Sequence, residues 1–171
     1  DIVAREIVEK GQPALQQIQQ TFGDWVLLKN GELDRRALRE HIFKEPNARQ
    51  QLEQITHPAI RQLAKERLAV ATSPYVVLVA PLLLEASEAG LANLCDKILV
   101  VDSHESLQLA RASQRDGQTP ERIKNIMANQ LARSERLAQA DDVIENNTSL
   151  EDLHAQLDRL HQHYLGLAKA Y

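Results

Sequence analysis

The chain has 171 residues, of which 43% are hydrophobic and 26% charged, values that are ordinary for one globular domain with a sizeable core. The formal net charge of -4 argues against a general nucleic-acid binder, whose affinity depends on a basic surface, and no apolar run approaches the ~20 residues that span a bilayer. Cys95 is the single cysteine, which excludes an internal disulfide and a zinc site built on several thiolates, and favours a reducing compartment, the cytoplasm.

The part of the chain ahead of residue 75 predicts helices. Pro13 and Pro46 can each occupy the first position of a helix, and Asp34 is a candidate N-cap for a helix that lies between those two. The pair His57-Pro58 predicts a break in the helix that Pro46 begins, because the residue before a proline is displaced from the αR region. Roughly 40 residues of helix ahead of a buried strand are longer than a plain crossover connection between strands, and this length predicts an inserted helical subdomain.

Three short apolar runs predict buried parallel strands, and they occupy residues 75–80, 98–101 and 143–144. The first two are continuous and β-rich, as expected where helices cover both faces of a sheet. Helical patterns fill the stretches between them, and the region from 104 to 140 is basic on particular faces, with a break around Gly117. This order predicts an α/β fold with a parallel sheet and right-handed crossovers.

The last predicted element is a helix that begins near Ser149, where the sequence Ser-Leu-Glu-Asp resembles a capping box. Its leucines and tyrosines recur at alternating spacings of 3 and 4 residues. A coiled coil with a partner needs about four heptads and this stretch has about three, so the pattern favours a helix that packs on the sheet. His154 and His161 on this helix are about 10.5 Å apart along its axis, too far to share a metal ion, and no metal site is predicted.

Two pairs of arginines have helical spacing. Arg111 and Arg115 are four residues apart, and Arg133 and Arg136 are three apart, so each pair shares a helix face. Guanidinium groups on adjoining helices could close over a polyphosphate and neutralise the charge of a transferring group. The alternative is that both pairs lie on solvated faces and bind nearby acids such as Asp141. The spacing alone leaves both interpretations open.

Polar side chains follow the predicted strands: Glu85 after the first, Asp102 at the end of the second, and Asn146 and Asn147 after the third. Ligands of open α/β sheets bind beyond the carboxyl ends of the strands, so these residues are candidates for a site. Glu85 has the alternative role of an acid in the first turn of a helix. His57 is either a ligand contact or only a helix breaker.

These residues belong to an ordered set that resembles the bacterial dephospho-CoA kinases of the P-loop kinase family. The resemblance covers essentially the whole chain and rests on segments 33–39, 57–60, 81–85, 101–102 and 140–146, with Phe43, Pro46, Gln108, Arg111, Arg115, Asp116, Gln130 and Arg133. It implies a P-loop kinase-like α/β fold, with a parallel sheet covered by helices on both faces. Residues 31–72 would form a helical CoA-binding insert, and residues 112–136 a helical lid.

The resemblance also implies the reaction, which is transfer of the ATP γ-phosphoryl group, with Mg²⁺, to the ribose 3′-hydroxyl of dephospho-CoA. Asp1 matches the second acid of the family's D-A-D motif, and would be a catalytic residue that orients or deprotonates that hydroxyl. Six further residues would line the dephospho-CoA pocket: His57, Arg61, Pro81, Leu82, Leu83 and Glu85.

The contacts to ATP follow from the same resemblance. Arg111 would stack near the adenine, a role that suits a planar cation, and Asn146 and Asn147 would lie near the adenine edge. Arg115 and Arg133 would be catalytic residues that face the phosphates from the lid, whose closure excludes water. The expected partners are therefore dephospho-CoA and ATP, with no nucleic acid and no membrane.

Two features depart from the family pattern. Leu84 replaces an aromatic residue, which exchanges one apolar group for another. No Gly-Lys pair occurs among the six glycines, although the family begins with a strand and a G-x-x-x-x-G-K-[ST] loop whose backbone N–H groups, lysine and hydroxyl hold the phosphates and Mg²⁺. We therefore expect residues 1–171 to be a fragment of a single kinase domain, without the first strand and P-loop (roughly 30 residues), and inactive as written.

Two other functions remain open at this point. One is a non-catalytic module that keeps the CoA pocket and no longer binds ATP. The other is a kinase of the same fold for another small metabolite or nucleotide. The helical segment 33–60 argues against the short-insert nucleoside monophosphate kinases, which lack its sequence pattern.

Overall fold

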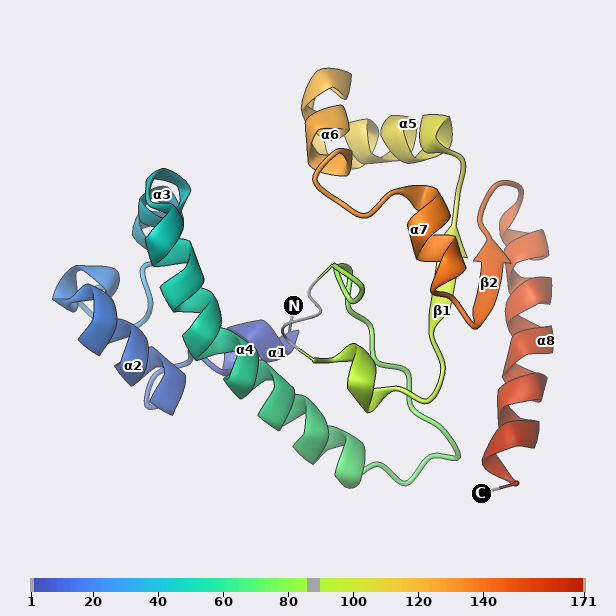
Figure 1. Cartoon of the computed structure of the whole chain (residues 1–171), viewed down its shortest axis with the longest axis horizontal. Helices are drawn as coiled ribbons and strands as arrows, with labels where there is room; N and C mark the ends of the chain where they lie inside the picture. The colour runs from blue at the N-terminus through green and yellow to red at the C-terminus, as the bar shows by residue number, and fades with distance from the viewer. Residues whose placement is uncertain (1, 86–89, 171) are drawn as a thin grey trace. The chain divides into compact units, whose positions relative to one another are not determined.

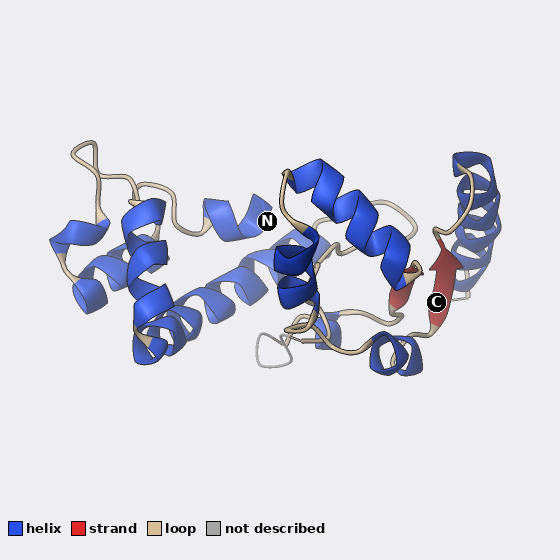
Figure 2. Cartoon of the chain, turned by 90° about the horizontal axis from the view of Figure 1, so that it is seen from above, coloured by secondary structure: helices blue, strands red, loops and turns tan. Residues whose placement is uncertain are grey.

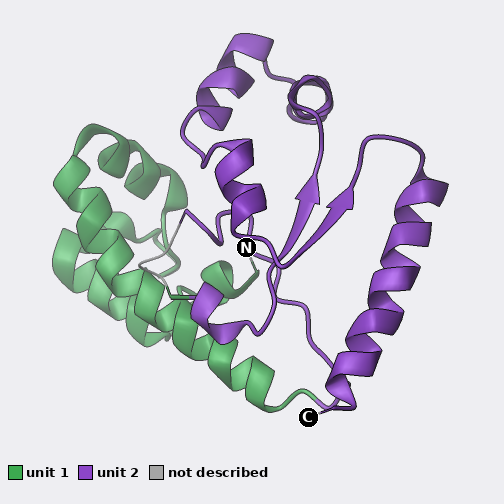
Figure 3. Ribbon diagram, turned by 45° about the vertical axis from the view of Figure 1, so that its right-hand side comes forward, with its two compact units in different colours: residues 1–71, 88–90 green, residues 72–87, 91–171 purple. Residues whose placement is uncertain are grey.

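A computed structural model describes residues 2–85 and 90–170 of the chain (Figure 1). The chain forms two compact units, of which the first comprises residues 1–71 and 88–90 and the second residues 72–87 and 91–171 (Figure 3). Within the described ranges, no helix has both the length and the apolar character needed to cross a membrane.

The first unit is helical, as the sequence predicts. Its elements are α1 (Ile2–Glu6), α2 (Pro13–Phe22), the 3₁₀ helix η1 (Asp24–Val26), α3 (Arg35–Lys44) and α4 (Pro46–Ala69). Their shared core is made of six buried apolar residues: Ile7, Val8, Ala14, Ile18, Val26 and Leu38. Ile18 and Val26 have 0% exposed surface, so α2 and η1 are anchored at the centre of this core.

The helix starts of this unit follow the local sequence signals. Pro13 and Pro46 lie in the first turns of α2 and α4, where a missing backbone N–H costs no helical hydrogen bond. Asp34 Oδ1 accepts a hydrogen bond from the backbone N–H of Ala37 at 2.9 Å, which confirms Asp34 as the N-cap of α3.

The predicted break at His57-Pro58 is wrong, because α4 is one continuous helix of 24 residues that contains Pro58. A proline inside a helix removes one backbone hydrogen bond and costs about 3 kcal/mol. Apolar side chains from both sides of Pro58, including Leu52 and Leu63, pack on the core of the first unit. Their burial on a single continuous face compensates for the proline, and local sequence rules do not capture this tertiary effect.

The second unit contains the parallel strands, shown in red in Figure 2. Its elements are η3 (Ala92–Leu94), β1 (Leu99–Asp102), α5 (Glu105–Asp116), α6 (Pro120–Met127), α7 (Arg133–Ala138), β2 (Asp142–Glu145) and α8 (Leu150–Ala168). Strands β1 and β2 pair in parallel, with Leu99 opposite Asp142 and Asp102 opposite Glu145. Parallel neighbours need a crossover, and α5, α6 and α7 form it. The predicted strands at 98–101 and 143–144 are therefore confirmed in place and direction, with bounds that differ by one residue, although Val101 and Val143 are 58% and 45% exposed rather than buried.

The predicted strand at residues 75–80 is not formed in the described chain. A strand requires a neighbour that accepts and donates backbone hydrogen bonds, and β1 pairs only with β2 in the described sheet. Val77 and Val79 are 65% and 79% exposed rather than buried. The run has the composition of a strand but no partner, which corrects the expectation that Glu85 follows a strand end.

The last helix contacts the sheet as predicted, although Leu150 and Leu157 of its leucine pattern are 67% and 38% exposed. It begins at the N-cap Ser149, whose hydroxyl accepts a hydrogen bond from the Asp152 N–H at 3.1 Å, and it contacts β2. The Tyr164 hydroxyl donates to Asp142 Oδ2 at 2.9 Å, which fastens α8 to the first residue of β2. Burial and the bond to Asp142 both raise the pKa of Tyr164, so this hydroxyl remains a donor.

Candidate functional site

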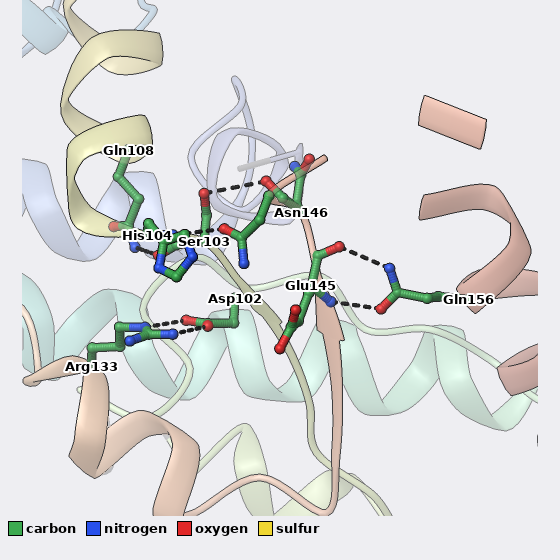
Figure 4. A network of polar contacts seen from close by, with 9 residues as sticks. Asp102, Ser103, His104, Gln108, Arg133, Glu145, Asn146 and Gln156 are labelled. Atoms are coloured by element: carbon green, nitrogen blue, oxygen red, sulfur yellow. Dashed lines mark hydrogen bonds and ion pairs between the residues drawn. The ribbon is translucent and has the colours of Figure 1, made fainter. Parts of the chain in front are cut away.

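The carboxyl ends of β1 and β2 carry an ion pair between Asp102 and Arg133 (Figure 4). Asp102 is the last residue of β1 and is 5% exposed, while Arg133 is the first residue of α7. Arg133 Nε donates to Asp102 Oδ1 at 2.8 Å, and Nη2 donates to Oδ2 at 2.5 Å. These charge-assisted bonds lower the pKa of Asp102, so its carboxylate is ionised at neutral pH.

The segments that follow the two strands are tied together by polar contacts (Figure 4). The Asn146 N–H donates to the Asp102 carbonyl at 2.8 Å, and the Ser103 hydroxyl donates to the Asn146 carbonyl at 3.3 Å. The His104 N–H donates to Asn147 Oδ1 at 2.8 Å. Asn146 therefore lies directly beside Asp102, and Asn147 contacts His104 two residues further on, as expected for the adjacent ends of parallel strands.

Arg111 reaches the same edge of the sheet from α5. Its Nη1 donates to the Asn146 carbonyl at 2.7 Å. The Asn146 N–H in turn bonds to the carbonyl of Asp102, whose side chain binds Arg133. One arginine from α5 and one from α7 are thus brought to neighbouring strand ends, although the sequence separates them by 22 residues.

The other two arginines of the predicted pairs have different surroundings. The Arg115 side chain is 76% exposed and binds the adjacent Asp116 through Nε and Nη2, at 2.7 and 2.8 Å. Arg136 Nη1 donates to the Leu131 carbonyl at 2.6 Å. Asp141, the alternative partner, instead accepts a hydrogen bond from Lys97 at 3.2 Å. Arg111 and Arg133 therefore bond to residues at the strand ends, whereas Arg115 and Arg136 bond to other partners.

Glu85 contacts the loop that precedes α7. Its Oε1 accepts a hydrogen bond from the Leu131 N–H at 3.1 Å. Glu85 therefore binds the backbone N–H of Leu131, and Arg136 binds the backbone carbonyl of the same residue. Pro81, Leu82 and Leu83 precede Glu85 in a turn whose Leu83 N–H bonds to the Ala80 carbonyl at 3.3 Å. The importance of Leu131 could not be found from the sequence, because its role depends on its backbone alone.

A cavity of about 330 Å³ lies between α5, α6 and α7. Its charged lining consists of Lys124, Arg133 and Arg136 together with one acid, Glu105. An excess of cations around a concave surface raises the local concentration of anions. Lys124 was not among the predicted site residues, and α6 brings it to the lining of this cavity.

Two other predicted residues lie on α4 in the first unit. His57 is half-buried and Arg61 is exposed, and because they are four residues apart they share one face of the helix. The Arg61 guanidinium packs against Gly90, where an added Cβ would lie 3.3 Å from Cζ. Gly90 also has φ +64°, in the left-handed region that favours glycine. Asp1 lies outside the described residues.

The metal-binding capacity of the described chain is small. Residues 2–85 and 90–170 contain no group of three or more His, Cys, Asp or Glu side chains that could hold a metal ion. The most buried carboxylate of the site, Asp102, already binds Arg133 through both oxygens. The arrangement can therefore bind anions through its arginines, but offers no cage for a cation made of protein groups alone.

Comparison with known proteins gives concordant results. A family model for dephospho-CoA kinase matches residues 1–152. The chain is 59% identical over 169 residues to a dephospho-CoA kinase of Psychrobacter arcticus, with 99% of this chain and 74% of that protein covered. It is 45% identical over 171 residues to the dephospho-CoA kinase of Escherichia coli strain K12, with 100% and 82% covered.

Solved structures also resemble the chain. A dephospho-CoA kinase from Campylobacter jejuni has a TM-score of 0.63 and 25% identity, and the match covers 99% of this chain and 83% of that one. A protein from Thermus thermophilus has a TM-score of 0.68 and 29% identity, with 87% and 74% covered.

Proposed function

The chain belongs to the dephospho-CoA kinase family, and we propose that its phosphoryl transfer takes place at the carboxyl ends of β1 and β2. The reaction is the ATP-dependent phosphorylation of the ribose 3′-hydroxyl of dephospho-CoA, the last step of coenzyme A biosynthesis. Phosphoryl transfer requires mainly that the reactants be positioned and that charge on the transferring group be neutralised. Arginines suit this task, because their planar fork matches phosphate oxygens.

One observation supports this location above the others. Beside the strand ends, the cavity between α5, α6 and α7 is lined by three cationic side chains and one acid. A triphosphate carries several negative charges, and fixed cations in a concave site stabilise the charge that spreads over the γ-phosphoryl group. We assign Arg133 and Arg115 as catalytic residues that face these phosphates. Arg115 would exchange its exposed partner Asp116 for the nucleotide.

The proposed lid, residues 112–136, includes α6 and the loop that carries Leu131. Its closure would exclude water from the transferring group. Arg111 would stack on the adenine while its Nη1 keeps the Asn146 carbonyl, because stacking uses the face of the guanidinium and the hydrogen bond uses its edge. Asn146 and Asn147 would border the adenine edge.

The acceptor would contact the helical insert, residues 31–72, and the turn at residues 81–85. We assign to dephospho-CoA six residues: His57, Arg61, Pro81, Leu82, Leu83 and Glu85. Asp1 is assigned to the ribose 3′-hydroxyl, as an orienting group or base. Mg²⁺ would enter with ATP, because kinases hold this ion largely through substrate phosphates, and no described residue is assigned to it.

We place the reaction in the cytoplasm. Cys95 is a free thiol in the structure, and burial, with the nearby charge of Asp96, raises its pKa. A single cysteine that forms no internal disulfide is typical of proteins of a reducing compartment.

Substitution of Arg133 in the full-length protein tests the location of the reaction. Arg133→Ala is expected to lower kcat by about 10²-fold or more, the scale found when one donor to a developing negative charge is removed. Arg122→Ala is the matched control, since Arg122 is exposed on α6 and does not line the cavity. Equal kcat values for the two variants would contradict the assignment of Arg133.

A further inference from the structure

We infer that Asp102 is a positioning residue of the kinase reaction, which holds one edge of the Arg133 guanidinium and leaves the other edge free for the nucleotide phosphates. The inference rests on the proposed function, in which Arg133 faces those phosphates. It begins from a difference between the two side chains. Arg133 lines the cavity between α5, α6 and α7, whereas Asp102 is 5% exposed and does not line it. Asp102 therefore lies behind Arg133 and acts on a ligand only through it.

The geometry of the pair leaves most of the guanidinium available. An arginine has five N–H donors, and the Asp102 carboxylate accepts one from Nε and one from Nη2. Three donors remain, two on Nη1 and one on Nη2, and these make no hydrogen bond among the described residues. Two parallel bonds fix the plane of the guanidinium as well as its position. The orientation of the free edge of the Arg133 guanidinium is therefore fixed before any ligand binds.

Asp102 is itself held by the sheet. Its backbone pairs with Glu145 in the β1–β2 register, and its carbonyl accepts the Asn146 N–H at 2.8 Å. Arg133, in contrast, is the first residue of a six-residue helix next to an irregular loop. A long side chain in such a place loses much rotamer freedom when it binds a phosphate, unless a partner has already ordered it. The rigid strand end supplies that order.

A positioning role and a purely charge-neutralising role for Asp102 predict different results. If Asp102 served only to neutralise Arg133, it would compete with phosphate, and its removal would strengthen nucleotide binding. A positioning role has the opposite consequence, because Asp102→Asn keeps the shape of the side chain but offers only one acceptor oxygen. The sign of the change in activity therefore distinguishes the two roles.

The test is a double-mutant cycle in the full-length protein, with kcat and the KM values for ATP and dephospho-CoA measured for each variant. Asp102→Asn is expected to lower kcat about 10-fold and to leave the KM for dephospho-CoA within about 2-fold, whereas in the Arg133→Ala background it should change kcat less than about 2-fold. Asp158→Asn, an exposed acid on α8, is the matched control and should behave as wild type.

Arg133→Lys repeats the test without changing the buried carboxylate, and remains informative where Asp102→Asn does not fold. An ammonium group has no planar edge, so it cannot form two parallel hydrogen bonds to Asp102 and also present a fixed pair of donors to phosphate; this variant should therefore lose kcat about as far as Arg133→Ala. Unchanged or increased kcat in Asp102→Asn, a full effect of Asp102→Asn in the Arg133→Ala background, or full activity of Arg133→Lys would each overturn the inference. Wild-type kcat in Arg133→Ala would instead refute the proposed role of Arg133, and the inference with it.

Discussion

Replacement of Pro58 by alanine should stabilise the protein, although Pro58 lies in the middle of its longest described helix. Helix α4 continues through this position, so the residue there adopts helical geometry without donating a backbone hydrogen bond. Alanine would restore an N–H that can bond to the carbonyl of Gln54, one turn earlier. Pro58 is exposed, and its removal therefore leaves no cavity in the core of the first unit.

The expected gain follows from two opposing terms. Proline is about 3 kcal/mol less favourable than alanine in a helix interior. Loss of proline also frees the unfolded chain, which offsets about 0.4–1 kcal/mol of that gain. The net stabilisation is about 2 kcal/mol, which corresponds to a rise in Tm of roughly 4–8 °C for a chain of this size.

Thermal and denaturant unfolding followed by circular dichroism would measure this change. Pro46→Ala is the matched control, because Pro46 lies in the first turn of the same helix, where the missing N–H costs nothing. Its Tm should stay within about 2 °C of wild type. A lower Tm for Pro58→Ala, or equal shifts for both variants, would refute the conclusion that α4 tolerates Pro58 through the packing of its flanking turns.

Two further predictions concern substrate choice and acid stability. In the full-length protein, dephospho-CoA should be phosphorylated far better than adenosine, AMP or shikimate when each is assayed with ATP and Mg²⁺; equal turnover of AMP would favour a nucleotide kinase instead. The bonds from Arg133 lower the pKa of Asp102 in the folded protein below its unfolded value of about 3.9. The stability that this carboxylate contributes is therefore fully present above the unfolded pKa. It is lost as the pH falls through the lower folded pKa. Asp102→Asn should therefore lose less free energy of unfolding than wild type between about pH 5 and pH 2, and equal losses in urea titrations across this range would contradict the assignment.

The sequence predicts the fold well where the signal is local. Proline at a helix start, Asp34 as an N-cap and Ser149 as a cap require only nearby residues, and all three are confirmed. The errors at Pro58 and at residues 75–80 have a common cause. In both places local preference points one way, whereas the outcome depends on packing or pairing with distant segments.

The candidate site was only partly accessible to the same reasoning. The sequence grouped Glu85, Asp102, Asn146 and Asn147 as polar residues at strand ends, and the structure brings Asn146 to Asp102, whereas Glu85 follows no strand of the described sheet. Helical spacing grouped Arg133 with Arg136, yet the structure pairs Arg133 with Asp102, 31 residues earlier. Spacing identifies residues that share a face, but not the partner that the crossover brings to that face.

The contacts around Leu131 link the two sides of the proposed reaction. Glu85, from the turn assigned to the acceptor, binds the Leu131 N–H, and Arg136 binds its carbonyl. Leu131 lies two residues before Arg133, which is fixed in turn by Asp102. The bond to Glu85 therefore fixes the backbone two residues before the arginine assigned to the phosphates. Charged side chains therefore hold both ends of the stretch from Leu131 to Arg133, and the position of Arg133 depends on the bond from Glu85 to Leu131 as well as on Asp102.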